Sequence, residues 1–131
     1  MIELVRQSLR FGAVGVINTG TGLGVIYGLM YFLGVAPVLA NAVGYTIGLG
    51  VSFLLNRAWT FNNSQPIVRV LPKYLLTAAT CYLLNVGVVV ACTSYLLVNA
   101  YLAQLAGIAV YTSCLFLGCN WFVFTKPSSA A

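Results

Sequence analysis

Two long stretches of uncharged, mostly apolar residues dominate the pattern along the chain. They cover residues 11–56, which is 46 residues, and residues 74–125, which is 52 residues. About 20 helical residues cross the hydrocarbon core of a bilayer, so each stretch has room for two crossings. Breaks at Gly34–Pro37 and Leu97–Ala100 divide the stretches. The pattern therefore predicts transmembrane helices over about 10–33, 37–58, 73–96 and 100–124.

The fold class follows from the continuity of these stretches. Strands of a membrane β-barrel alternate polar and apolar residues, and these stretches do not, so helices are favoured. Only 5% of the 131 residues are charged, whereas soluble domains carry about 25%. We predict an all-α integral membrane protein with four transmembrane helices. Residues 1–131 would form a single membrane domain, with a loop at about 62–72 and a tail at 125–131.

The positive charges indicate the orientation in the membrane. The six cations flank the apolar stretches instead of interrupting them: Arg6, Arg10, Arg57, Arg69, Lys73 and Lys126. The two predicted turns carry none, so the positive-inside rule places both termini and the 62–72 loop in the cytoplasm. A net charge of +5 distributed in this way does not indicate nucleic-acid binding.

The two halves of the chain resemble each other at an offset of 63 residues. Residues 10–61 align with residues 73–124 without a gap and share ten identical positions. Cationic entries (Arg10 and Lys73) and aromatic exits (Phe61 and Phe124) coincide at the same offset. Because each repeat has two helices, both repeats enter from the same side. We therefore expect parallel repeats related by an axis along the membrane normal.

The chain lacks residues that several kinds of catalysis, metal binding and proton-coupled transport require. The chain has no His, and its four cysteines fall inside predicted helices without metal-ligand spacing. We expect no disulfide, metal or other cofactor, and no catalytic residues, so the protein is not predicted to be an enzyme. No carboxylate follows Glu3, which disfavours a proton-coupled small drug exporter.

Landmark residues recur where the predicted helices begin and end. They are Arg10-Phe11 with Gly15 and Asn18, the exit Phe53-x-x-Asn56-Arg57-x-Trp59-x-Phe61, the restart Lys73-Tyr74, and the exit Phe116 to Phe124. Together they resemble the GtrA-like family of small four-helix membrane proteins, over almost the whole chain. The second exit departs from the first, since Cys119 and Asn120 stand where Asn56 and Arg57 stand. This departure weakens a phosphate-binding role in the second half.

The resemblance implies translocation (flipping) of a polyprenyl-phosphate-linked sugar across the bacterial inner membrane, for glycosylation of cell-envelope polysaccharides. It also implies membrane lipids and a glycosyltransferase as partners. The alternative function is a non-transporting membrane subunit that anchors or organises a polyprenyl-phosphate glycosyltransferase. Gly20, Gly24 and Gly28 form a strip suited to helix association, so we expect a homo-oligomer.

The candidate site residues follow from the chemistry of such a substrate. Cationic side chains suit its phosphate, amides suit the sugar hydroxyls, and interface aromatics suit a sugar face. Phosphate candidates are Arg57, Arg10 and Lys73; polar-path candidates are Asn18, Asn41, Asn56 and Asn85; interface aromatics are Trp59 and Phe61. Each has a structural alternative: the cations as orientation anchors, the amides as interhelical hydrogen bonds, and the aromatics as an interfacial belt.

Overall fold

The computed structural model describes residues 1–125, which are helical apart from short connections. The helices are α1 (Ile2–Leu33), α2 (Pro37–Leu55), α3 (Ile67–Ser94) and α4 (Ala100–Gly118), with the π-helices η1 (Asn56–Thr60) and η2 (Cys119–Val123). No strand occurs among these residues. The all-α prediction is therefore confirmed. The chain divides into two compact units, Met1–Ser64 and Gln65–Ala131, which we describe separately.

Four helical segments are long and apolar enough to cross a membrane. They are Ile2–Leu33, Pro37–Thr60, Ile67–Ser94 and Ala100–Val123. These segments correspond to the four predicted helices, so the chain is a multi-pass membrane protein. The parallel arrangement of the repeats and the cytoplasmic location of the termini stay predictions.

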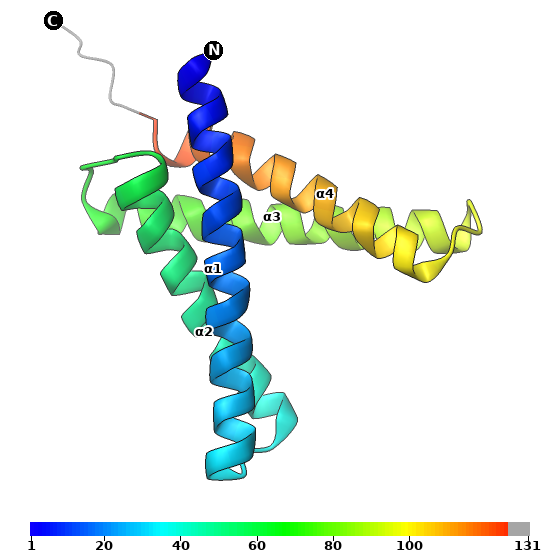
Figure 1. Cartoon of the computed structure of the whole chain (residues 1–131). Helices are drawn as coiled ribbons and strands as arrows, with labels where there is room; N and C mark the ends of the chain where they lie inside the picture. Colours follow the sequence, from blue (N-terminus) through cyan, green and yellow to red (C-terminus); the bar gives the residue numbers. More distant parts are fainter. Residues whose placement is uncertain (126–131) are drawn as a thin grey trace, which may run out of the picture. The chain divides into compact units, whose positions relative to one another are not determined.

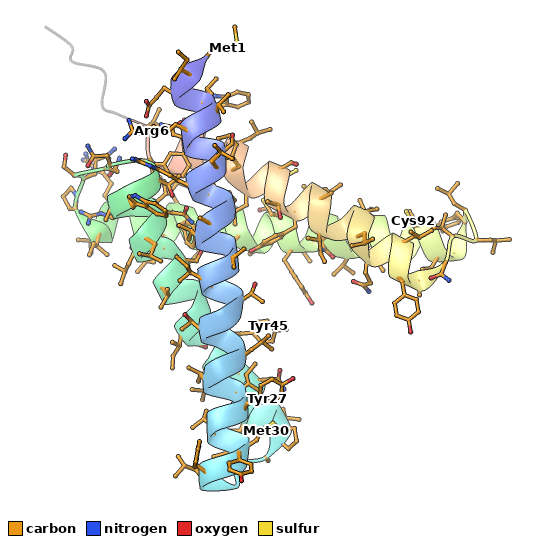
Figure 2. The ribbon with its side chains drawn as sticks, viewed as in Figure 1. Met1, Arg6, Tyr27, Met30, Tyr45 and Cys92 are labelled. Atoms are coloured by element: carbon orange, nitrogen blue, oxygen red, sulfur yellow. The ribbon has the colours of Figure 1, made fainter. Side chains whose placement is uncertain are left out.

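Two helices begin earlier than the hydropathy pattern predicted. α1 begins at Ile2, and at 1.5 Å per residue its 32 residues span about 48 Å, more than a hydrocarbon core of about 30 Å. Met1 and Arg6 lie at its amino-terminal end (Figure 2). α3 begins at Ile67 instead of Lys73, with Pro72 inside it. Pro72 stands in the second turn of α3 and has no N–H to donate to the Val68 carbonyl, which lies in the exposed start of the helix.

The first unit is a hairpin in which α1 and α2 lie side by side (Figure 1). The face of α2 toward α1 repeats every four residues and is small: Ala40, Gly44, Gly48 and Ser52 are buried. The Gly22 carbonyl oxygen lies 3.0 Å from the position that a Gly44 Cβ would take, so the two backbones approach closely. Gly34 ends α1 at φ 62°, a left-handed conformation that glycine adopts without steric cost.

The second unit is a hairpin of α3 and α4, also side by side (Figure 1). Buried Gly107 faces α3, where Val89 Cγ2 lies 2.8 Å from the position of a Gly107 Cβ. The connection contains Leu97 at φ 51°, and this residue stands 63 positions after Gly34. Glycine is therefore replaced by leucine at the same left-handed turn position.

The 63-residue offset also relates backbone details inside the two units. The π-helices η1 and η2 begin 63 residues apart, at Asn56 and Cys119. Phe61 N–H donates to the Asn56 carbonyl at 2.9 Å, and Phe124 N–H donates to the Cys119 carbonyl at 2.9 Å. The second helix of each hairpin, α2 or α4, therefore widens into a π-helical turn at the same position, close to its carboxyl end.

Candidate functional site

The exit of the first hairpin is a π-helical turn closed by an arginine from the neighbouring helix. Arg10 Nη1 donates to the Trp59 carbonyl at 2.9 Å, and its Cζ lies 5.5 Å from the centroid of the Trp59 ring. A cation at the carboxyl end of a helix satisfies a terminal carbonyl and complements the helix dipole. Arg10 therefore fastens the third turn of α1 to the end of η1.

A buried ladder of hydrogen-bonded side chains runs through the same turn. Asn56 Nδ2 donates to Ser52 Oγ at 3.3 Å, and Thr60 Oγ1 donates to Asn56 Oδ1 at 3.0 Å. Ser52, Asn56 and Thr60 are 7%, 1% and 2% exposed. We call these three residues the polar ladder. Its hydrogen bonds offset the cost of burying an amide and two hydroxyls.

Arg57 follows the central residue of the polar ladder. Its side chain is half-buried, with Nε away from solvent. Its carbonyl accepts from Asn63 N–H at 2.8 Å, because Asn62 adopts a left-handed conformation at φ 44° and turns the chain back. Asparagine tolerates this conformation better than most residues. The carbonyl of Arg57 is therefore held by the turn that follows it.

The two predicted interface aromatics occupy different environments. Phe61 is buried and packs edge-on against Phe11, with ring centroids 6.4 Å apart and an interplanar angle of 68°. Trp59 is 42% exposed and lies against Arg10. Phe61 thus contributes to packing within the hairpin, whereas part of the Trp59 ring is exposed at the end of the hairpin.

The structure brings together five of the candidate residues in the first unit. They are Arg10, Asn56, Arg57, Trp59 and Phe61, which share the exit end of the hairpin. Asn18 lies elsewhere on α1, with Oδ1 2.6 Å from the position of a Gly48 Cβ, so it packs against α2. Asn41 is exposed and donates from Nδ2 to the Pro37 carbonyl of its own helix at 2.8 Å. The amides of this unit do not form one line.

The second unit contains the remaining candidates. Lys73 Nζ lies 5.3 Å from the centroid of the Phe122 ring, which matches the Arg10–Trp59 contact at the 63-residue offset. Asn85 Oδ1 lies 3.1 Å from the position of a Gly107 Cβ, so it packs against α4. Tyr74 and Phe124 correspond to Phe11 and Phe61, with ring centroids 6.4 Å apart.

Three residues with a clear structural role were absent from the sequence-based site: Ser52, Thr60 and Phe122. Phe122 could have been found, because it stands 63 residues after Trp59. Ser52 and Thr60 could also have been found, because they stand four residues before and four residues after Asn56, a spacing that places side chains on one face of a helix.

Other features do not add a second site. Among residues 1–125 no group of three or more His, Cys, Asp and Glu could hold a metal ion. The four cysteines are free. A shallow apolar hollow lies along the α1 surface near the α1–α2 turn, where Figure 2 labels Tyr27 and Met30. It is lined by Gly24, Tyr27, Gly28, Met30, Tyr31 and Phe32, and it lacks polar groups suited to a sugar phosphate.

Comparison with known proteins identifies the family. Searches of curated proteins and of solved structures gave no match. The family described as "GtrA/DPMS, transmembrane domain" matches residues 10–124, which include all or most of each transmembrane helix. The match begins at Arg10 and ends at Phe124, the first and last of the repeat landmarks. The chain therefore belongs to the GtrA/DPMS transmembrane-domain family.

Proposed function

We propose that the protein moves a polyprenyl-phosphate-linked sugar across the bacterial inner membrane, for glycosylation of cell-envelope polysaccharides. The family fits translocation of lipid-linked sugars in general. The observation that carries the finer proposal is the exit of the first hairpin, where one turn carries the half-buried Arg57, the partly exposed Trp59 and two residues of the polar ladder. A guanidinium, an amide and an indole are suited to a phosphate and a sugar.

Arg57 is the proposed phosphate contact because it is the cationic candidate that directly follows Asn56, the central residue of the polar ladder, at the exit of the first hairpin. The position that corresponds to Arg57 in the second unit is Asn120, which has no charge. Charge-assisted hydrogen bonds to phosphate contribute about 1.5–3 kcal/mol each. Loss of Arg57 should therefore weaken substrate binding by about tenfold or more.

The test measures transbilayer movement of a polyprenyl-phosphate hexose in proteoliposomes, read as protection from a membrane-impermeant oxidant. Wild type should move the lipid faster than protein-free liposomes do. Arg57→Ala should reduce the rate about tenfold or more, and Arg57→Lys should reduce it less, because the charge stays while the planar fork is lost. Arg69→Ala is the matched control, since Arg69 is an exposed arginine at the start of α3.

The outcomes separate carrier from subunit. Wild-type protein that moves no lipid would contradict the proposal. If a glycosyltransferase then co-purifies with the protein and loses activity without it, the accessory-subunit function is correct. Wild-type movement with an unaffected Arg57→Ala variant would keep the carrier function and remove Arg57 from the phosphate site.

A further inference from the structure

The polar ladder of the first unit has an apolar counterpart in the second unit. Ser52, Asn56 and Thr60 are all at least nine-tenths buried. The positions 63 residues later are buried to the same degree and carry apolar or weakly polar side chains: Leu115, Cys119 and Val123. The same three places in the hairpin are therefore polar in one unit and apolar in the other.

The backbone around these positions is the same in both units. Each set spans the change from an α-helix to a π-helix, at Asn56 in one unit and Cys119 in the other. The hydrogen bond that widens the turn is 2.9 Å long in both cases. The second unit therefore shows that this backbone forms without polar side chains at the three positions.

Stability does not account for the polar ladder. Polar groups buried in a membrane protein need partners, and their net contribution to stability after pairing is small. Replacing both partners of a buried hydrogen bond by apolar groups of the same shape is often neutral or stabilising. A hairpin of this kind could carry apolar residues at all three positions, as the second unit does. The polar ladder is therefore better explained by a role in function than by a requirement for folding.

We propose that Ser52, Asn56 and Thr60 are positioning residues that orient Arg57 toward the substrate phosphate. This inference rests on the proposed function. Asn56 is bonded to the residue four before it and to the residue four after it, so its amide is fixed in place directly before Arg57 in the chain. The ladder occurs in the unit that has the arginine and is absent from the unit that has Asn120 instead. The ladder and the arginine therefore occur together, in the first unit alone of the two described units.

The test makes the three positions apolar or weakly polar without enlarging any side chain on the closely packed face of α2. The triple variant Ser52→Ala, Asn56→Cys, Thr60→Val should stay folded, because it removes both partners of each buried hydrogen bond. Its apparent KM for the polyprenyl-phosphate hexose should rise about tenfold in the proteoliposome assay. Thr60→Val removes a hydroxyl at nearly constant volume and should also raise KM above the wild-type value. Thr60→Ser keeps the hydroxyl, so its KM should stay close to that of wild type.

Combining the triple variant with Arg57→Ala tests whether the ladder acts through Arg57. The combined variant should be no slower than Arg57→Ala alone, because residues that act through one group are not additive. Three results would overturn the inference: a triple variant that unfolds or melts much earlier, a folded triple variant with wild-type KM, or losses that multiply in the combined variant. Wild-type protein that moves no lipid would instead refute the proposed function, and the inference would fail with it.

Discussion

Arg10 links the two arms of the first hairpin, because it lies on α1 and contacts Trp59 at the end of η1. Its guanidinium bonds the Trp59 carbonyl and lies over the Trp59 ring. We expect Arg10→Ala to lower stability by about 1 kcal/mol, since a helix-end cation and a cation–π contact each contribute roughly 0.5–1 kcal/mol. The measurement is thermal unfolding of the purified protein in detergent, where the melting temperature should fall by a few degrees.

Two further variants control this prediction. Arg6→Ala removes the same charge from an exposed position of α1 and should leave the melting temperature unchanged. Arg10→Lys should recover much of the loss, because Lys73 makes the corresponding contact with Phe122 in the second unit. Equal melting temperatures for Arg10→Ala and Arg6→Ala would show that the Arg10 contact contributes nothing.

The site residues show what sequence patterns can and cannot predict. Arg57 and Asn56 were predicted as neighbours at a helix exit, and the structure keeps them there. The contact between Arg10 and Trp59 joins residues 49 positions apart, so it requires knowing which helix ends meet. Asn41 was named with Asn56 as a polar-path candidate, but it lies at the far end of α2 and donates to the Pro37 carbonyl of its own helix.

At the scale of the helices, hydropathy predicted four crossings because each must place about 20 apolar residues in lipid. It did not predict the π-helical turns, because an extra residue shifts the helical register, and a stretch that is apolar on nearly every face does not reveal such a shift. It also placed the start of α3 at about Lys73, where the second uncharged stretch begins. The structure begins α3 at Ile67, where the polar loop ends.

The glycines of the helices divide into two groups that a substitution can distinguish. Gly44 faces α1, and an added Cβ would fall on Ile26 and lie 3.0 Å from the Gly22 carbonyl oxygen. Overpacking of this kind costs about 1–3 kcal/mol, so Gly44→Ala should destabilise the first hairpin. Gly24 has open space around it, and Gly24→Ala should be neutral or slightly stabilising, because alanine favours the helix.

Thermal unfolding in detergent measures both glycine variants directly. A Gly44→Ala protein as stable as Gly24→Ala would show that the α1–α2 packing adjusts to an extra methyl group. The Gly20, Gly24 and Gly28 strip has open space on α1, so it remains the predicted face for a homo-oligomer. If copies of the protein associate through that face, Gly24→Ala should weaken cross-linking between them in membranes, because the added methyl group keeps the two helices apart.

For the whole molecule, the distribution of charge predicts one orientation in the membrane. All six cations lie outside the two short connections, and the connections at residues 34–36 and 95–99 carry no charge. Positive residues near helix ends are retained in the cytoplasm, so the bias is six to none. Alkaline phosphatase fused at Ala36 or Val98 should be active, and fused at Ser64 it should be inactive. Green fluorescent protein should fluoresce when fused at Ser64 or at the carboxyl terminus.

This orientation also determines where a substrate phosphate first meets Arg57. With residue 64 in the cytoplasm, the exit of the first hairpin opens toward the cytoplasmic leaflet, and the proposed contact acts on lipid-linked sugars from that side. A protein that inserts in both orientations would give phosphatase activity at Ser64 as well as at Ala36. Arg57 would then face both leaflets in the membrane population. The orientation can also be shifted by moving two positive charges: Arg69→Gln and Lys73→Gln remove them from the region of residues 62–73, and lysines at residues 35 and 98 add them to the short connections. Alkaline phosphatase fused at Ser64 should then become more active, because the difference in positive charge between the two sides is smaller.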